Sequence, residues 1–337
     1  MTILEAVGPG VAVLGLGCVL LLWGAEEFME HLGAVAALTG IPVLALGLLL
    51  AGAEPEELAT ALIASSQGHP VLAATDAIGA NVTMLTLGLG LAFLVRPVAI
   101  TRVLRRYALL AVVAEVLALA ALADGRVGRW EAATLCLAYV GVVAGVWWLE
   151  RRPPAFGEVA ELLEEDEPAA RDMGSGPDDP QAQKRPPSAW RAARRPVGMV
   201  LAGLAAMVVG GALAVDGAAR LAQASGLGEH ATGLSALAFA TSAEVLALVV
   251  AARRRALTQV AVGGVLGSAI YNATLTLGAA AYAGDLTAPG LVPAAAIGAA
   301  LPLVVLCAVW RPIARPLGGV LVVGYVAYIA AVLEGRI

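Results

Sequence analysis

Long apolar runs alternate with short polar segments along this chain. A helix that crosses a bilayer needs about 20 predominantly apolar residues. Ten runs approach or exceed that length, near 10–30, 33–64, 71–95, 105–123, 130–149, 197–222, 231–252, 257–283, 289–310 and 315–333. The pattern predicts an all-α membrane protein with about ten transmembrane helices, five in each half of the chain.

Residues 150–196 interrupt this pattern. They are acidic first, rich in proline with glycine and serine in the middle, and basic at the end. Such a composition buries too little apolar surface to form a packed core, so it predicts a solvated, disordered linker. We therefore expect a first five-helix membrane repeat over 1–149, a linker over 150–196 and a second five-helix membrane repeat over 197–337. The first run lacks a basic leader and a cleavage site, so we expect it to be a retained span and not a signal peptide.

The overall composition agrees with a membrane protein. Of the 337 residues, 60% are hydrophobic and 14% are charged, whereas soluble domains average about 45–50% apolar and about 25% charged residues. The net charge of −5 is small for this length and indicates no nucleic-acid partner. The three cysteines, Cys18, Cys136 and Cys307, stand far apart in apolar runs, which argues against a disulfide framework or a cysteine metal site.

The basic residues gather on one side of the predicted helices. If the amino terminus faces out, the clusters at 102–106 and 253–255 fall inside together with the linker. The outside segments then hold only Arg126, Arg129 and Arg336. This asymmetry follows the positive-inside rule. We expect a multi-pass protein of the cell membrane with both termini outside and a cytoplasmic linker.

The two halves contain matching segments in the same order. They are 24–47 with 210–233, GLLLAGAEPEELATALIAS with GLSALAFATSAEVLALVVA, and TDAIGANVTMLTLGLG (75–90) with GGVLGSAIYNATLTLG (263–278). Because each half has an odd number of spans, the second copy is inverted in the membrane. Inverted repeats place a binding site at mid-depth, where the two copies meet.

Several carboxylates lie inside these apolar runs without a basic neighbour in the sequence. An ionisable group at bilayer depth costs a few kcal/mol on insertion scales and usually faces a partner or a cavity. A cation is the natural counter-charge. Carboxylates combined with hydroxyl, amide and carbonyl oxygens form the hard site that calcium and sodium prefer. The carboxylates are Glu54, Glu56, Glu57 and Glu244, and the neutral oxygens of the second half come from Thr241, Ser242, Ser268 and Asn272.

At these residues the chain resembles the cation/calcium exchanger superfamily, which includes sodium/calcium and proton/calcium antiporters. That family carries two inverted repeats with a signature like GTS-x-PE-L on one helix and GS-N-I-x-N on the next. The second half matches with ATSAEV, which is one residue shorter and holds Glu244, and with GSAIYN, which holds Ser268 and Asn272. The first half has GAEPEEL. The residues that follow the glutamates favour Glu57 as the counterpart of Glu244, whereas the Pro-Glu pair of the family signature favours Glu56. We prefer Glu57.

The first half departs from the family signature at several ligand positions. Ala53 and Glu54 stand where hydroxyls are expected, Ala80 where the family has serine, and Met84 where it has asparagine or aspartate. Asn81 matches the helix pattern. The resemblance implies ten helices, calcium at two central glutamates, and alternating access by sliding of the first and sixth helices over the core. The missing ligands leave a proton-coupled exchanger or one of altered selectivity open.

Each candidate also has a structural alternative. The glutamates Glu57 and Glu244 could be protonated and hydrogen-bonded, and Glu54 and Glu56 could lie at a hydrated rim. Asp76 could be a ligand or a helix N-terminal carboxylate favoured by the dipole. An intramembrane hydrolase would need a motif such as HExxH or GxSxG, and the sequence contains neither. A membrane protein of the same fold that has lost transport is the other alternative.

The sequence thus predicts a secondary active antiporter that exchanges calcium for sodium or protons, and not an enzyme. We expect the protein to need no cofactor. Its expected partners are inorganic cations and the lipid bilayer, and we expect a monomer. The candidate ion ligands are Glu57, Glu244, Asn272, Ser268, Thr241, Ser242, Glu54, Glu56, Asp76 and Asn81.

Overall fold

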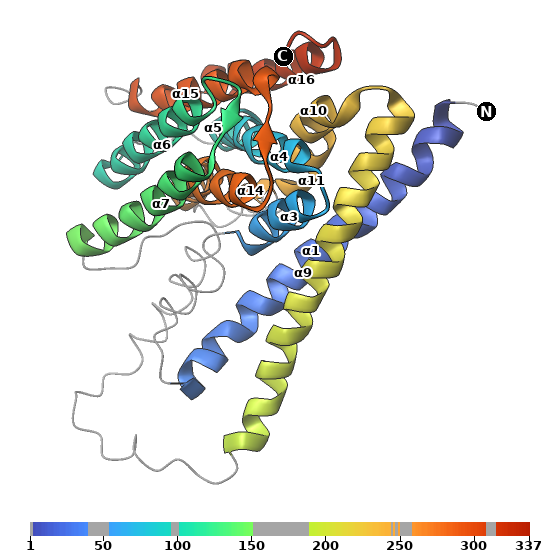
Figure 1. Cartoon of the computed structure of the whole chain (residues 1–337). Helices are drawn as coiled ribbons and strands as arrows, with labels where there is room; N and C mark the ends of the chain where they lie inside the picture. The colour runs from blue at the N-terminus through green and yellow to red at the C-terminus, as the bar shows by residue number, and fades with distance from the viewer. Residues whose placement is uncertain are drawn as a thin grey trace.

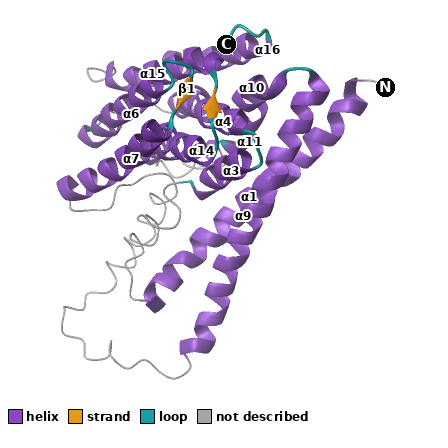
Figure 2. Ribbon diagram, viewed as in Figure 1, coloured by secondary structure: helices purple, strands orange, loops and turns teal. Residues whose placement is uncertain are grey.

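The computed structural model describes residues 3–39, 54–95, 101–150, 189–243, 245, 246, 249, 258–307 and 315–337. Within them the chain is mostly helical, with two short strands and short connecting loops (Figures 1 and 2). The α-helices of the first half are α1 (Ile3–Thr39), α3 (Pro55–Ser66), α4 (Pro70–Thr83), α5 (Leu89–Val95), α6 (Arg102–Ala121) and α7 (Arg129–Glu150). Those of the second half are α9 (Ala189–Ser225), α10 (Gly228–Thr232), α11 (Ala238–Thr241), α13 (Thr258–Tyr271), α14 (Leu277–Ala283), α15 (Val292–Cys307) and α16 (Arg315–Leu333). Most of the predicted linker, 151–188, lies outside the described residues, and α9 begins earlier than the predicted second repeat.

Six helical segments of the described residues are long and apolar enough to cross a membrane. They are Val7–Phe28, Pro70–Leu94, Arg129–Val146, Arg195–Ser225, Pro289–Cys307 and Arg315–Leu333. On α7 the indoles of Trp130 and Trp148 are 88% and 81% exposed. They are separated by about 27 Å along the helix axis, close to the thickness of a hydrocarbon core of about 30 Å. Tryptophans at this spacing are typical of anchors at the two membrane interfaces.

Three π-helical segments interrupt the apolar helices of the described residues. They are η1 (Met84–Gly88), η3 (Gly233–Leu237) and η4 (Asn272–Thr276). η1 follows α4 and η4 follows α13, and the two occupy equivalent positions of the matched segments 75–90 and 263–278. A π-helical turn widens the hydrogen-bond pattern and occurs frequently at functional sites. The inverted repeat therefore extends to this irregularity of the backbone.

The long helices α1 and α9 lie side by side and extend beyond the rest of the bundle (Figure 1). Glycines at intervals of seven residues line their contact, with Gly10, Gly17 and Gly24 on α1 against Gly217, Gly210 and Gly203 on α9. A Cβ atom on Gly24 would lie 2.7 Å from the carbonyl oxygen of Gly203. Since one series rises as the other falls, the helices are antiparallel and their backbones touch.

The remaining helices interleave the two halves of the chain. α3 and α4 form a hairpin whose turn contains Gly68 in the left-handed region, with φ of 88°. α4 packs against η3, α11, η4 and α14 of the second half. Two-residue strands, β1 (Arg126–Val127) and β2 (Leu286–Thr287), pair antiparallel between loops of the two halves (Figure 2). The helices that carry the candidate ligands thus meet across the boundary between the repeats.

Candidate ion-binding site

Three glutamates gather where α3 begins. Pro55 is the first helical residue, a position where proline loses no hydrogen bond, and Glu54 precedes it as the N-cap. Glu56 and Glu57 occupy the first turn, where the unpaired N–H groups of the helix favour negative charge. The exposures of Glu54, Glu56 and Glu57 are 2%, 2% and 1%. The structure therefore contradicts the alternative that placed Glu54 and Glu56 at a hydrated rim.

Asp76 lies in the middle of α4, facing the second half of the chain. The first turn of α4 contains no acidic residue, so the interpretation of Asp76 as a helix N-terminal carboxylate was wrong. The Oγ1 of Thr241, the last residue of α11, donates a hydrogen bond of 3.1 Å to the Oδ1 of Asp76. Both side chains are buried. This bond joins a carboxylate of the first repeat to a hydroxyl of the second.

Asn272, from the second repeat, contacts one of the glutamates. The Nδ2 of Asn272 donates to the Oε2 of Glu54 over 3.4 Å, and its Oδ1 accepts a hydrogen bond of 2.9 Å from Thr276. The hydroxyl oxygen of Ser268 is fully buried one turn earlier on α13, without a hydrogen-bond partner among the described residues. The side chain of Asn272, from the second repeat, therefore stands beside a carboxylate of the first, with Ser268 one helical turn away along the chain.

Glu57 is the least satisfied member of this group. Neither of its carboxylate oxygens makes a hydrogen bond of ordinary geometry to the described residues, although the Asn272 amide interacts with it more weakly. Its negative charge is opposed by Glu54, Asp76 and Glu56. Within their described ranges α3, α4, α11 and α13 contain no lysine, arginine or histidine. A buried carboxylate such as Glu57, surrounded by other carboxylates, is stabilised by a bound cation or by protons.

The structure places the other predicted ligands differently. Ser242 is buried and donates its hydroxyl over 2.6 Å to the backbone oxygen of Ala238 in the preceding helical turn. Asn81 donates its amide nitrogen to the carboxylate of Glu115 and to the backbone of α13, and its Oδ1 is buried without a hydrogen-bond partner among the described residues. Glu244, the predicted partner of Glu57, lies outside the described residues.

Two tyrosines and one glutamate near these residues were missed from the sequence. The rings of Tyr139 and Tyr271 stack edge to face with centroids 5.3 Å apart, and both interact electrostatically with Glu54. They place aromatic surface near Glu54. Glu115 is fully buried on α6. A carboxylate inside the apolar run 105–123 was the available signal for it.

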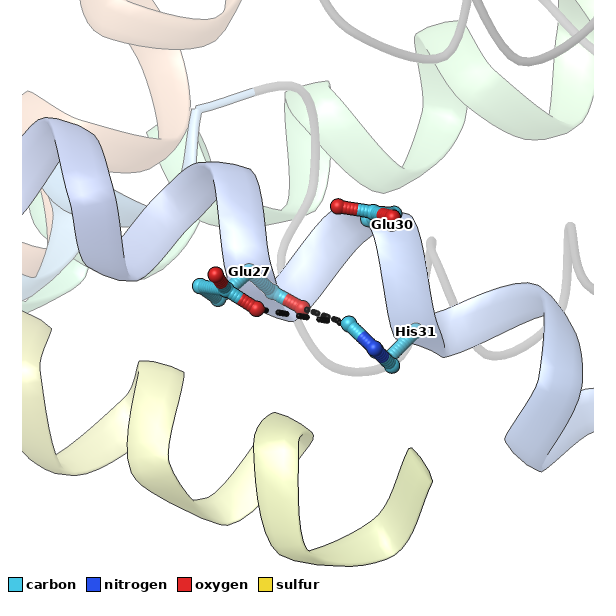
Figure 3. A group of neighbouring side chains, drawn as sticks. All are labelled: Glu27, Glu30 and His31. Atoms are coloured by element: carbon cyan, nitrogen blue, oxygen red, sulfur yellow. Dashed lines mark hydrogen bonds and ion pairs between the residues drawn. The ribbon is translucent and has the colours of Figure 1, made fainter. Parts of the chain in front are cut away.

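A second group of possible metal ligands lies on α1. The ligand atoms of Glu27, Glu30 and His31 fall within 4.8 Å of one another (Figure 3). The imidazole Nδ1 of His31 lies 3.0 Å from the backbone oxygen of Glu27 and 3.5 Å from its Oε2. Glu30 is exposed. All three residues lie on one face of α1, three or four positions apart, so the spacing of a helix is sufficient to explain their proximity.

Buried carboxylates at the meeting point of two inverted helical repeats define a multi-pass membrane transporter of cations. Residues 9–148 and 195–333 match the family described as sodium/calcium exchanger protein. The matched segments cover most of the chain and correspond to its two halves. The chain belongs to this family, which confirms the predicted resemblance and the expectation of a transport protein rather than an enzyme.

Individual relatives and solved structures agree with this assignment. CaxA of Alkalimonas amylolytica, a candidate antiporter, is 29% identical over 287 residues, covering 84% of this chain and 82% of CaxA. The inner membrane protein YrbG of Escherichia coli (strain K12) is 27% identical over 333 residues, covering 95% of each chain. The sodium-calcium exchanger NCX_Mj soaked with 10 mM Na⁺ and 10 mM Sr²⁺ has a TM-score of 0.58 at 23% identity, over 96% of this chain and 98% of that one. These likenesses confirm the all-α fold with two repeats.

Proposed function

We propose that this protein is a secondary active antiporter that exchanges calcium for sodium or protons by alternating access. The proposed ligands are Glu57, Glu244, Ser268 and Asn272, with Thr241, Ser242, Glu54, Glu56 and Asp76 around them. The observation that carries the proposal is the Glu57 carboxylate, which is buried among three other carboxylates with neither oxygen in a full hydrogen bond. Membership of the exchanger family supports the same function.

Calcium suits this group of side chains better than a softer metal. It takes six to eight oxygen ligands at about 2.3–2.6 Å, from carboxylates, amides and carbonyls, and tolerates irregular geometry. Cysteine and histidine, the ligands of softer metals, are absent from the described ranges of α3, α4, α11 and α13. The charge of several carboxylates favours a divalent cation over a single monovalent one.

Coupling follows from competition for the same oxygens. Sodium ions or protons that neutralise the carboxylates remove the charge that holds calcium, so the two kinds of ion occupy the site in turn. Met84 supports protons as the coupling ion, because it is fully buried at the position equivalent to Asn272 and offers no ligand oxygen for an additional sodium ion.

The proposed topology has both termini outside and the segment 150–196 as a cytoplasmic linker between membrane repeats 1–149 and 197–337. It rests on the arginine distribution, with few basic residues in the segments that would lie outside. Labelling of single cysteines introduced at residues 175 and 336 with an impermeant reagent tests it. Residue 336 should react from outside in intact cells, whereas residue 175 should react only after permeabilisation.

Uptake of calcium-45 into proteoliposomes tests the transport function directly. We expect uptake when the liposomes are loaded with sodium or hold an outward proton gradient, and we expect the ion that drives it to identify the coupling. Glu57→Gln and Glu244→Gln should reduce uptake at least tenfold, whereas Glu30→Gln, at an exposed position of α1, should retain it. Absence of uptake under both gradients, with wild type and Glu57→Gln behaving alike, would reject the antiporter and favour a membrane protein that has lost transport.

A further inference from the structure

Glu115 is a second buried carboxylate, carried by α6 and separate from α3 and α4. It is fully buried, thirteen residues after the start of α6, which places it about 20 Å along that helix. α6 packs against α13 and α15. These two helices contain no charged residue in their described ranges. Burial of a carboxylate in such surroundings is costly, so its presence calls for a specific role.

The carboxylate of Glu115 is hydrogen-bonded to the side chain of Asn81. Its Oε1 accepts a hydrogen bond of 2.8 Å from the Nδ2 of Asn81. The same nitrogen donates a second hydrogen bond of 3.0 Å to the backbone oxygen of Ala269 on α13. A primary amide has two N–H donors on one side and an acceptor on the other. Both donors of Asn81 are thus committed, one to α6 and one to α13.

This arrangement selects one orientation of the Asn81 amide. In the flipped orientation the Oδ1 would face the Glu115 carboxylate and the Ala269 carbonyl, two acceptors that repel it. Ala269 directly follows Ser268 on α13 and precedes Asn272, the first residue of η4, by three residues, so it belongs to the helical turn between two of the proposed ligands. Holding its carbonyl fixes that turn against α4.

On the side away from Asn81, helix α15 leaves room for the carboxylate of Glu115. Gly298 of α15 lies against it, and a Cβ atom at that position would stand 2.9 Å from the Oε2 of Glu115. Any side chain there would displace the carboxylate. The absence of a Cβ atom at residue 298 therefore keeps Glu115 within reach of Asn81.

We propose that Glu115 is a positioning residue of the ion site, which acts by orienting the Asn81 amide and thereby the helical turn between Ser268 of α13 and Asn272 of η4. The inference rests on the proposed function, because it assigns Glu115 an effect on cation affinity. It also gives Asn81 a role other than that of an ion ligand. Groups that orient the ligands of a metal change its affinity by about 10–100-fold when they are removed.

Calcium titrations of thermal stability in the purified full-length protein test this role. Glu115→Leu removes the acceptor for Asn81 and should raise the apparent Kd for calcium about tenfold. Glu115→Gln keeps an oxygen that accepts from Asn81 and should restore the wild-type Kd to within about threefold, which a loss of charge alone would not. Gly298→Ala leaves Glu115 in the sequence but pushes on its carboxylate, and it should raise the Kd in the same direction.

Gly141→Ala is the matched control, because a Cβ atom on this glycine of α7 would meet nothing within 4 Å. Its Kd should equal that of wild type. If Glu115→Leu does not fold, the Gly298→Ala and Glu115→Gln pair decides the question. An unchanged Kd in Glu115→Leu or in Gly298→Ala, with a normal calcium response in wild type, overturns the positioning role and leaves the proposed function standing. Absence of any calcium response in wild type instead removes calcium binding, and with it both proposals.

Discussion

Asn81 and Ala269 occupy equivalent positions of the two repeats, and the amide of Asn81 donates a hydrogen bond of 3.0 Å to the carbonyl oxygen of Ala269. The two residues are 188 positions apart, the same separation that relates the first residues of η1 and η4, Met84 and Asn272. The repeats therefore meet at this bond. The first repeat has an amide side chain at the position where the second repeat has alanine. The backbones of the two repeats are therefore symmetric here, whereas their side chains are not.

The hydrogen bond between Thr241 and Asp76 should contribute measurably to stability. Thr241→Val removes the donor and leaves a buried carboxylate oxygen less satisfied, at a cost of about 1–3 kcal/mol. Thr241→Ser retains the hydroxyl and should lie close to wild type. Thr134→Val is a suitable comparison, since the hydroxyl of Thr134 is exposed on α7 and bonds only within its own helix. Thermal unfolding of the purified protein measures all three, and equal effects of Thr241→Val and Thr134→Val would contradict the prediction.

Removing the charge of Glu57 should raise the stability of the cation-free protein and weaken its binding of calcium. In calcium-free buffer we expect Glu57→Gln to unfold at a higher temperature than wild type, because it relieves repulsion among buried carboxylates. Its stabilisation by added calcium should be largely lost, since a ligand stabilises only in proportion to its binding. Glu30→Gln, on the exposed side of α1, should change neither quantity. A Glu57→Gln variant with the calcium response of wild type would exclude Glu57 as a ligand.

The contact between α1 and α9 should be sensitive to a single methyl group. Gly17→Ala places a Cβ atom against the backbone of Ala214 and Gly210, and overpacking of this kind costs about 1–3 kcal/mol. Gly15→Ala, two residues away on the same helix, meets nothing within 4 Å. The comparison cancels the difference in helix propensity between glycine and alanine. Thermal unfolding in detergent micelles should show a lower midpoint for Gly17→Ala only, and equal midpoints would refute direct backbone contact.

Met84→Asn should place a polar oxygen at the first position of η1, which is equivalent to Asn272 in the second repeat. Without cations we expect a loss of about 1–3 kcal/mol, since Met84 is fully buried and an amide there lacks a prepared partner. Sodium should recover part of this loss, because a neutral oxygen ligand favours a monovalent cation. The measurement is the rise in unfolding temperature with sodium at constant ionic strength, with potassium as the control salt. A sodium response no larger than in wild type would show that residue 84 does not reach the ions.

Much of the architecture followed from the sequence because membrane insertion imposes a simple rule. Every backbone polar group in lipid needs an internal partner, so apolar runs of sufficient length become helices. The six spanning segments of the described residues coincide with predicted runs, and the family match covers the two predicted halves. The carboxylates of α3 could be found in the same way, since a charge inside an apolar run is conspicuous. The same signal was present at Glu115.

The sequence by itself determined the class of protein, the inverted repeat and the candidate carboxylates, since all of these depend on composition and periodicity along the chain. Only the tertiary structure decided which side chains meet. In the structure Glu54 and Glu56 are buried, Asp76 accepts a hydrogen bond from Thr241 and does not lie at a helix end, and Asn81 donates to Glu115. Such contacts depend on how helices distant in sequence rotate and pack, and close packing of that kind leaves no periodic signal in either partner alone.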